Sequence, residues 1–374
     1  MRIQLRSNVD NGWNHLVPAH RVPLDPAASE DAVSGKTILI TGAGGCIGAA
    51  LAKRVLDGKP RELLLLDRCE ETLYQLGRSL PAEEYAPAFR LVAGDVGDRC
   101  LIAALLEENR PDVILHAAAY KHVPLMEANP FACVENNAIL TWQLAKAAAE
   151  AGVAQFLLIS TDKAANPRSV LGASKCVAEQ SVRRWGAHPR RYSAIRLVNV
   201  LGSAGSVLPL FLEQIERGGP LTITHPEATR YFLTLEDTVS LILAAAALPG
   251  AGTVYIPEVS QSMRIVDLAN DLLHQVAHEK ASAIRIEYTG LRPGEKLRED
   301  LVSAGESLRS TAHPAIREID AAPLSAAEVD RTLDQLKESV ERRDVSALLE
   351  TLCGLVPDYE PSRTVCPAGL GVHD

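Results

Sequence analysis

The sequence predicts an α/β protein built on a doubly wound parallel sheet, together with a smaller, discontinuous α/β domain and a helical C-terminal tail. The main observation is that short apolar runs alternate with helical segments from residue 36 to about residue 200. Such alternation is typical of parallel sheets with right-handed crossovers. The strands are expected at residues 37–40, 63–66, 89–93, 113–116, 156–159 and 193–197. The first helix should end near residue 56, and the later ones should cover 70–80, 100–108, 131–149 and 172–185.

Composition narrows the class of protein. The 374 residues carry a net charge of −9 and form no dense basic cluster, which argues against a nucleic-acid binder. The seven cysteines are scattered, odd in number and without a C-x-x-C pair, so we expect neither a disulfide framework nor a metal site. No apolar run is long enough for a membrane span, and no signal peptide is evident. A soluble, cytoplasmic protein is therefore expected.

A glycine-rich loop follows the first strand. Gly42, Gly45 and Gly48 form a G-x-x-G-x-x-G pattern that opens a helix. Glycines allow a tight turn there, and they let backbone amides approach a pyrophosphate at the helix N-terminus. The pattern predicts a dinucleotide site in a Rossmann sheet, with Cys46 and Ile47 also beside the cofactor.

Residues at the ends of the next strands bear on which dinucleotide binds. Asp67 ends the second strand, where a carboxylate hydrogen-bonds the adenosine ribose and repels a 2′-phosphate, so NAD is favoured. Arg68 could accept that phosphate, and NADP stays an alternative. Asp95 and Val96 should flank the adenine, although the same residues could simply begin a helix. The fourth strand leads into three further cofactor candidates, Ala117, Ala118 and Ala119.

The strand at 156–159 leads directly into Thr161, Asp162 and Lys163, and Lys175 follows within the next helix. In open α/β sheets, ligands bind at the carboxyl ends of strands. A carboxylate and an amine held side by side shift each other's pKa values and can serve acid–base chemistry. The alternative for Asp162 and Lys163 is an exposed ion pair on a loop.

The regular alternation ends after Asn199, and the chain divides into four parts. Residues 1–34 are expected to form an N-terminal arm. Residues 35–200 should form the Rossmann domain, which also receives part of 230–256, and residues 201–310 should mainly form a substrate domain. Residues 311–374 should form the helical tail, which begins at Ser325 with Glu328 in capping-box spacing.

Several segments together resemble the CapD-type polysaccharide-biosynthesis proteins, which are nucleotide-sugar 4,6-dehydratases of the extended short-chain dehydrogenase/reductase group. The resemblance covers roughly residues 35–362, and its matching segments are 41–48, 116–124, 160–166, 199–203, 229–232 and 290–297. Short-chain dehydrogenases usually place a tyrosine four residues before the lysine, where this chain has Leu171. Long family members typically carry methionine there, so the chain resembles the catalytic half of that tyrosine-less group.

The resemblance implies a reaction and a role for each central residue. A UDP-N-acetylglucosamine 4,6-dehydratase oxidises C4 by hydride transfer to NAD, loses water across C5 and C6, and returns the hydride to C6. Lys163 would be the base at C5 and Asp162 the acid at the C6 hydroxyl. Thr161 would hydrogen-bond the C4 oxygen, and Lys175 would hold the nicotinamide ribose. Without the tyrosine, the group that takes the C4 hydroxyl proton is left open.

Further polar residues are candidates for binding a UDP-sugar: Lys121, His122, Asn199, Ser203, Arg230, Arg292 and Glu295. Arg292 suits a diphosphate because a guanidinium offers planar bidentate hydrogen bonds. Glu295 could orient Arg292 or cap a helix, His122 could be purely structural, and Arg230 could line the domain interface.

The central residues bear on two alternative functions, and two helices bear on the assembly state. A UDP-N-acetylhexosamine 4-epimerase would need no acid at C6, so the Asp162–Lys163 pair argues against it. A non-catalytic NAD-binding protein would not need Thr161, Asp162, Lys163 and Lys175 together. The helices at 131–149 and 172–185 have apolar positions on more than one face, which predicts a homo-oligomer.

Overall fold

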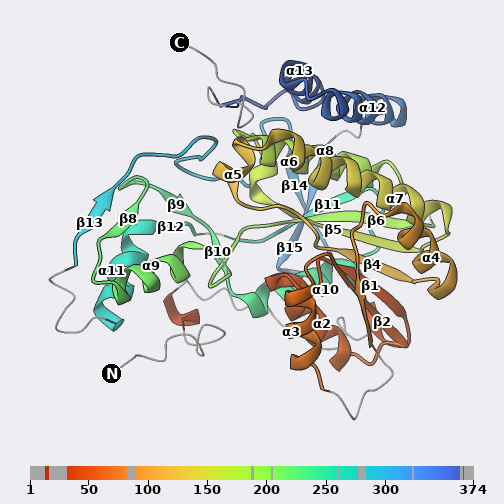
Figure 1. Ribbon diagram of the computed structural model, residues 1–374, viewed down its shortest axis with the longest axis horizontal. Coiled ribbons are helices and arrows are strands. Elements are labelled where there is room, and N and C mark those ends of the chain that lie inside the picture. The colour runs from red at the N-terminus through yellow and green to blue at the C-terminus, as the bar shows by residue number, and fades with distance from the viewer. Residues whose placement is uncertain are drawn as a thin grey trace.

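The computed structural model describes residues 13–16, 32–81, 89–186, 189–203, 205–259, 261–276, 284–321, 324–362 and 365. Most of the expected arm at 1–34 therefore lies outside the described residues. Figure 1 shows a large central sheet with helices on both faces, a smaller lobe at one side, and a pair of C-terminal helices, α12 and α13, above the sheet's helical layer.

The predicted doubly wound sheet is present, and it has nine strands in the order β14-β15-β11-β6-β5-β4-β1-β2-β3. Its mutually parallel strands are β1 (Thr37–Thr41), β2 (Glu62–Asp67), β3 (Phe89–Ala93), β4 (Val113–His116), β5 (Gln155–Thr161), β6 (Arg191–Leu197) and β11 (Thr253–Pro257). The chain crosses from β3 to β4 beside β1, so the strand order reverses between β1 and β4. A ligand crevice is expected at such a reversal.

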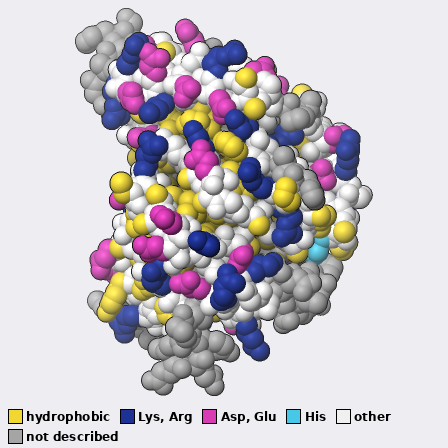
Figure 2. Space-filling view, turned by 90° about the vertical axis from the view of Figure 1, so that its right-hand side faces the viewer, with side chains coloured by type: hydrophobic (Ala, Val, Ile, Leu, Met, Phe, Trp, Pro, Cys, Tyr) yellow, Lys and Arg dark blue, Asp and Glu magenta, His cyan; other side chains and the backbone are white. Residues whose placement is uncertain are grey.

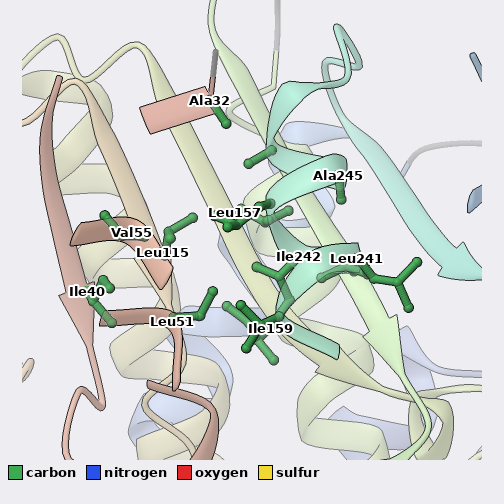
Figure 3. Packing of buried hydrophobic residues seen from close by; sticks show 14 of the residues in the cluster. Ala32, Ile40, Leu51, Val55, Leu115, Leu157, Ile159, Leu241, Ile242 and Ala245 are labelled. Atoms are coloured by element: carbon green, nitrogen blue, oxygen red, sulfur yellow. The ribbon is translucent and has the colours of Figure 1, made fainter. Parts of the chain in front are cut away.

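Alternate residues of each strand point into the two helical layers. Ile38 and Ile40 pack in the layer that contains α2 (Cys46–Asp57) and α10 (Leu235–Ala247), as Figure 3 shows for Ile40. Leu39 packs in the opposite layer. The helices of this second layer are α4 (Arg99–Asn109), α7 (Leu140–Glu150) and α8 (Val170–Arg183). Helix α3 (Glu70–Ser79) packs beside α2. Covering both faces of β5 explains why its residues 156–159 form an apolar run.

The long helix expected at 131–149 is not regular. It runs as α6 (Pro130–Val134), a π-helical turn at Glu135–Ile139 and α7. The short α5 (Val123–Glu127) precedes it. π-helical turns are rare and are found mostly at functional sites. Asn136, within this turn, lines the crevice described below.

The smaller lobe combines short strand pairs with two helices. The pairs are β7 (Asn199–Val200) with β10 (Phe232–Leu233), β8 (Leu221–Ile223) with β13 (Ile286–Tyr288), and β9 (Thr229–Arg230) with β12 (Met263–Arg264). The helices are α9 (Val207–Glu216) and α11 (Ile265–Val276). Phe211 and Leu268 are fully buried in the core of this lobe, and Leu16 from the short η2 turn (Asn14–Leu16) joins them.

The C-terminal region contains more than helices. Strands β14 (Ser307–Ser310) and β15 (Ile316–Asp320) extend the main sheet in the antiparallel direction. These two strands were not predicted from the sequence. The expected helical region follows as α12 (Ala326–Arg342) and α13 (Val345–Leu355). The capping box at its start is formed, because Ser325 and Glu328 each accept a hydrogen bond from the other's backbone N–H.

Helices α12 and α13 cover α6, the π-helical turn and α8 (Figure 1). Leu333 and Leu352 are fully buried in one cluster with Val170 and Leu171 of α8. The apolar surplus that led us to predict a homo-oligomer is therefore covered by the same chain. Homo-oligomerisation stays a prediction, but this surface no longer supports it.

On the face shown in Figure 2, Lys and Arg side chains are interspersed with Asp and Glu and do not gather in one basic patch. Among the described residues, no helix is long and apolar enough to cross a membrane. In the same part of the chain, no group of His, Cys, Asp and Glu side chains is arranged to hold a metal ion.

Candidate active site

The glycine loop between β1 and α2 leaves no room for side chains. Gly42 has a φ of +69°, and a Cβ there would lie 2.6 Å from the backbone nitrogen of Ala118. A Cβ on Gly48 would lie 2.1 Å from the carbonyl oxygen of Gly42. Gly45 is the N-cap of α2 and provides no side-chain cap, so the first N–H groups of the helix are left for a ligand. The loop therefore has the form of a phosphate cradle.

A crevice opens at the strand-order reversal beside this loop. It is lined by Gly42, Gly45, Leu66, Asp67, Arg68, Gly94, Asp95, Val96, Ala117, Ala118, Ala119 and Asn136. The structure thus brings together most of the residues predicted for the cofactor. Of the other four, Cys46 begins α2, Ile47 packs against the core, Gly48 lies in α2 against Gly42, and Lys175 lies in α8. Leu66, Gly94 and Asn136 were not predicted; the first two directly neighbour predicted residues, whereas Asn136 comes from a helix far away in sequence.

The acidic residue at the end of β2 is fixed in place. Asp67 accepts hydrogen bonds from the backbone N–H of Gly44, at 2.9 Å, and of Cys69, at 2.8 Å. The guanidinium of Arg68 lies 3.4 Å from a carboxylate oxygen of Asp95 and stacks over the Tyr120 ring. Two carboxylates therefore border this end of the crevice, and the adjacent arginine is already engaged.

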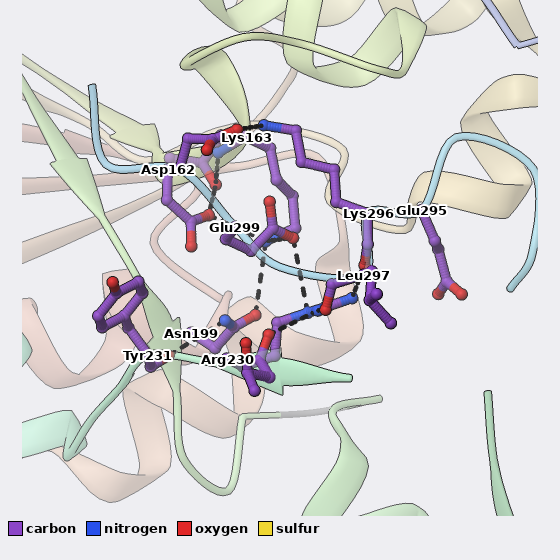
Figure 4. Close-up of polar contacts among 12 residues, drawn as sticks. Asp162, Lys163, Asn199, Arg230, Tyr231, Glu295, Lys296, Leu297 and Glu299 are labelled. Carbon is purple, nitrogen blue, oxygen red and sulfur yellow. Dashed lines mark hydrogen bonds and ion pairs between the residues drawn. The ribbon is translucent and has the colours of Figure 1, made fainter. Parts of the chain in front are cut away.

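The predicted acid–base pair lies at the carboxyl end of β5, where the short η4 turn (Asp162–Ala164) begins. Lys163 Nζ is 2.9 Å from Asp162 Oδ1, which also accepts a hydrogen bond from Thr161 Oγ1 at 3.0 Å (Figure 4). Asp162 is fully buried, and its Oδ2 has no hydrogen-bond partner among the described residues. The pair is thus no exposed ion pair: it sits in a site where desolvation strengthens electrostatic interactions.

Two residues from the smaller lobe complete this cluster. Glu299 Oε1 lies 3.2 Å from Lys163 Nζ, and Asn199 Oδ1 lies 3.5 Å from it. The sequence does not mark Glu299, because the segment that resembles the CapD-type family ends at residue 297 and an irregular loop gives no periodic signal. Arg230 faces Glu299 at 3.5 Å and donates to the carbonyl oxygens of Lys296 and Leu297. Its guanidinium therefore lies between Glu299 and these carbonyl oxygens, and its role in binding a UDP-sugar or lining the domain interface stays a prediction.

Burial and neighbouring charges raise the pKa values of Asp162 and Lys163 and lower that of Glu299. Burial raises the pKa of the Asp162 carboxyl, and the Lys163 ammonium only partly opposes this. Burial works to lower the pKa of Lys163, but the charges of Asp162 and Glu299 outweigh it and raise that pKa. For Glu299, burial is outweighed by Lys163 and Arg230, and its pKa is lowered. The site thus favours a protonated Asp162 more than an ordinary carboxyl and keeps Glu299 ionised.

Helix α8 presents Lys175 and Leu171 beside this loop. Lys175 is buried and donates to the carbonyl oxygen of Ile159 at 2.7 Å, and burial lowers its pKa to about 8. Leu171 is 2% exposed and packs in the cluster that α12 and α13 complete. Gly172 lies so near the loop that a Cβ there would be 2.2 Å from the Lys163 carbonyl oxygen.

The other substrate candidates lie at the rim. Burial lowers the pKa of His122, and the positive charges of Lys121 and Arg292 lower it further, so these groups lie near one another. Arg292 is oriented by Glu295, at 2.5 Å between Nη2 and Oε1. A rim of this charge suits a diphosphate. Ser203 lies in the turn after β7, and two residues further on a Cβ on Gly205 would lie 2.6 Å from His122 Cε1; substrate binding by Ser203 stays a prediction.

The fold and this site define a member of the extended short-chain dehydrogenase/reductase class, and its glycine loop and crevice have the form of a dinucleotide site. The chain belongs to the polysaccharide biosynthesis protein family, whose model matches residues 38–321. It is 42% identical over 292 residues to the capsular polysaccharide biosynthesis protein CapD of Staphylococcus aureus, with 76% of this chain and 48% of CapD covered. The chain thus spans about half the length of that relative.

Two further comparisons cover most of both partners. The chain is 34% identical over 278 residues to a UDP-N-acetylglucosamine 4,6-dehydratase (inverting) of Campylobacter jejuni, covering 73% of this chain and 79% of the relative. The X-ray structure of Pen from Bacillus thuringiensis matches with a TM-score of 0.72 and 28% identity, over 78% of this chain and 90% of Pen. The resemblance to CapD-type proteins noted from the sequence is therefore confirmed.

Proposed function

We propose that this chain is a nucleotide-sugar 4,6-dehydratase that acts on UDP-N-acetylglucosamine with NAD, in the synthesis of surface polysaccharide precursors. The observation that carries the proposal is the Asp162–Lys163 pair at the carboxyl end of β5, in which the carboxyl group is fully buried. Elimination of water across C5 and C6 needs a base and an acid side by side, whereas 4-epimerisation does not need the acid. The activity for which the Campylobacter relative is named, that of a UDP-N-acetylglucosamine 4,6-dehydratase, supports the same choice.

The residues of the chain can close the proton balance of this reaction. Bound NAD would accept the hydride from C4 and return it to C6. Thr161 Oγ1 donates to Asp162, so a proton leaving the C4 hydroxyl can pass through Thr161 to Asp162. Asp162 then gives that proton to the departing C6 hydroxyl, which leaves as water. Lys163 takes the C5 proton and gives it back to C5, provided that it enters the cycle as the neutral amine.

The surroundings of the crevice favour NAD over NADP in this proposal. A 2′-phosphate beside the adenosine ribose would meet the carboxylates of Asp67 and Asp95. Arg68, which could have welcomed it, is drawn to Asp95 and Tyr120. Because the hydride is borrowed and returned, the dinucleotide needs no release, and purified protein should carry it.

The decisive experiment incubates the purified protein with UDP-N-acetylglucosamine and follows the product by mass spectrometry. We expect loss of water without added cofactor and without accumulation of NADH absorbance, and NAD in the denatured supernatant. Asp162→Asn and Lys163→Ala should each lower turnover about 10²- to 10⁴-fold while bound NAD is retained. A product of unchanged mass with altered C4 stereochemistry would instead identify an epimerase, and an unreacted substrate would refute both.

A further inference from the structure

The catalytic lysine candidate lies between two carboxylates that come from different parts of the fold. Asp162 reaches Lys163 from the end of β5, and Glu299 reaches it from the loop that joins β13 to β14. The Glu299 side chain is 2% exposed. Its loop is tied to the catalytic turn, because Lys296 Nζ donates to the carbonyl oxygen of Ala165 at 2.7 Å. Glu299 is therefore held at a fixed place relative to Lys163.

The carboxylate of Glu299 faces two cations, and each of them also has another partner. Lys163 is already paired with Asp162 at 2.9 Å, and Arg230 already donates to backbone carbonyl oxygens. Glu299 Oε2 is buried and has no hydrogen-bond partner among the described residues. A buried carboxylate is costly unless it is paired, so its charge has to act on the groups that face it. The charge of Glu299 is thus better explained by what it does to Lys163.

We propose that Glu299 is a positioning residue for Lys163, which it holds toward the reacting sugar and whose basicity it sets from the smaller lobe. The inference rests on the proposed function in taking Lys163 as the base at C5. The charged groups that face Lys163 are Asp162, Glu299 and Arg230, with Lys296 next to Glu299. Arg230 opposes the effect of the two carboxylates on Lys163; Asp162 has the larger influence, and Glu299 adds to it from the smaller lobe.

The direction of the effect follows from these charges. A negative charge beside an amine stabilises its ammonium form, so Glu299 makes Lys163 a stronger base toward the weakly acidic C5 proton. The same charge lowers the fraction of neutral amine at a given pH. Turnover should therefore rise with pH as Lys163 loses its proton. Removing the Glu299 charge should move that rise to lower pH and weaken the base.

The pKa of Lys163 can be read without any turnover. Holoprotein is labelled with trace acetic anhydride across a pH series, and acetylation of Lys163 is quantified by peptide mass spectrometry. We expect the midpoint for Glu299→Gln to fall by about one to three pH units relative to wild type, the shift typical of a nearby opposite charge. Asp300→Asn is the matched control: it removes a neighbouring carboxylate that pairs with Lys296, and its Lys163 midpoint should stay at the wild-type value.

Turnover then tests the link to catalysis. In Glu299→Gln, the rising limb of kcat against pH should move with the labelling midpoint, while KM for the UDP-sugar and bound NAD are unchanged. Glu299→Asp keeps the charge but withdraws it by one methylene, so it should keep most of the midpoint and lose kcat. Equal Lys163 midpoints in wild type, Glu299→Gln and Glu299→Asp would overturn the inference. If no sugar is dehydrated at all, the proposed function fails while the labelling experiment still decides the role of Glu299.

Discussion

The close approach of α8 to the catalytic turn predicts that a single methyl group at Gly172 displaces Lys163. A Cβ at this position would lie 2.2 Å from the Lys163 carbonyl oxygen, where an ordinary contact begins at 3.4 Å. The obstacle is backbone, so it cannot rotate away as a side chain would. Either the turn or the helix has to move by about 1 Å, and a misplacement of that size in a catalytic group can cost about 10²-fold in rate.

The assay compares Gly172→Ala with Gly354→Ala, which adds the same methyl group on α13 with nothing within 4 Å. Gly172→Ala should lower kcat for water loss by about 10²-fold and destabilise the fold by about 1–3 kcal/mol through overpacking. Gly354→Ala should keep wild-type kcat and change stability by about 1 kcal/mol at most. Bound NAD, measured in both variants, shows that the Rossmann sheet is intact. Wild-type turnover in a folded, NAD-loaded Gly172→Ala would refute the reasoning.

Two other expectations concern the cluster that joins α8 to the C-terminal helices. Leu171→Met should be nearly silent in turnover and cost under about 1.5 kcal/mol in unfolding free energy, because the volumes are similar and Leu171 only packs; a large loss of kcat would show that the side chain matters for chemistry. Leu333→Ala should cost about 2–5 kcal/mol in urea denaturation, since the side chain is fully buried. The exposed neighbour Asp334, changed to alanine, should shift the same curve by about 0.5 kcal/mol or less.

The sequence predicted the parts of the fold that repeat a local pattern. Each expected parallel strand is present, because a strand covered on both faces must be an apolar run. The glycine loop could also be predicted from the sequence, because Gly42 and Gly48 have no space for a Cβ and must be glycine. The strand-end position of Asp162 and Lys163 followed from the same alternation.

What the sequence could not show depends on contacts between distant segments. Glu299 contacts Lys163 although several helices and strands separate the two residues in the sequence. Nothing in the irregular loop that holds Glu299 marks it as a partner. The orientation of Arg230 depends on carbonyl groups of another loop. The apolar faces of α8 and its neighbours indicate that something covers them, but the pattern cannot tell a second subunit from α12 and α13 of the same chain.

Because α12 and α13 cover α8, the end of the family match and the end of the smallest fragment with a covered α8 lie at different residues. The family match ends at residue 321, just after β15, so a fragment cut there keeps every strand of the main sheet. It would nevertheless leave Val170 and the other apolar residues of α8 facing water, although they are buried in the intact chain. The family model thus ends with the last strand of the sheet, whereas the smallest fragment that keeps these apolar residues covered extends through α13.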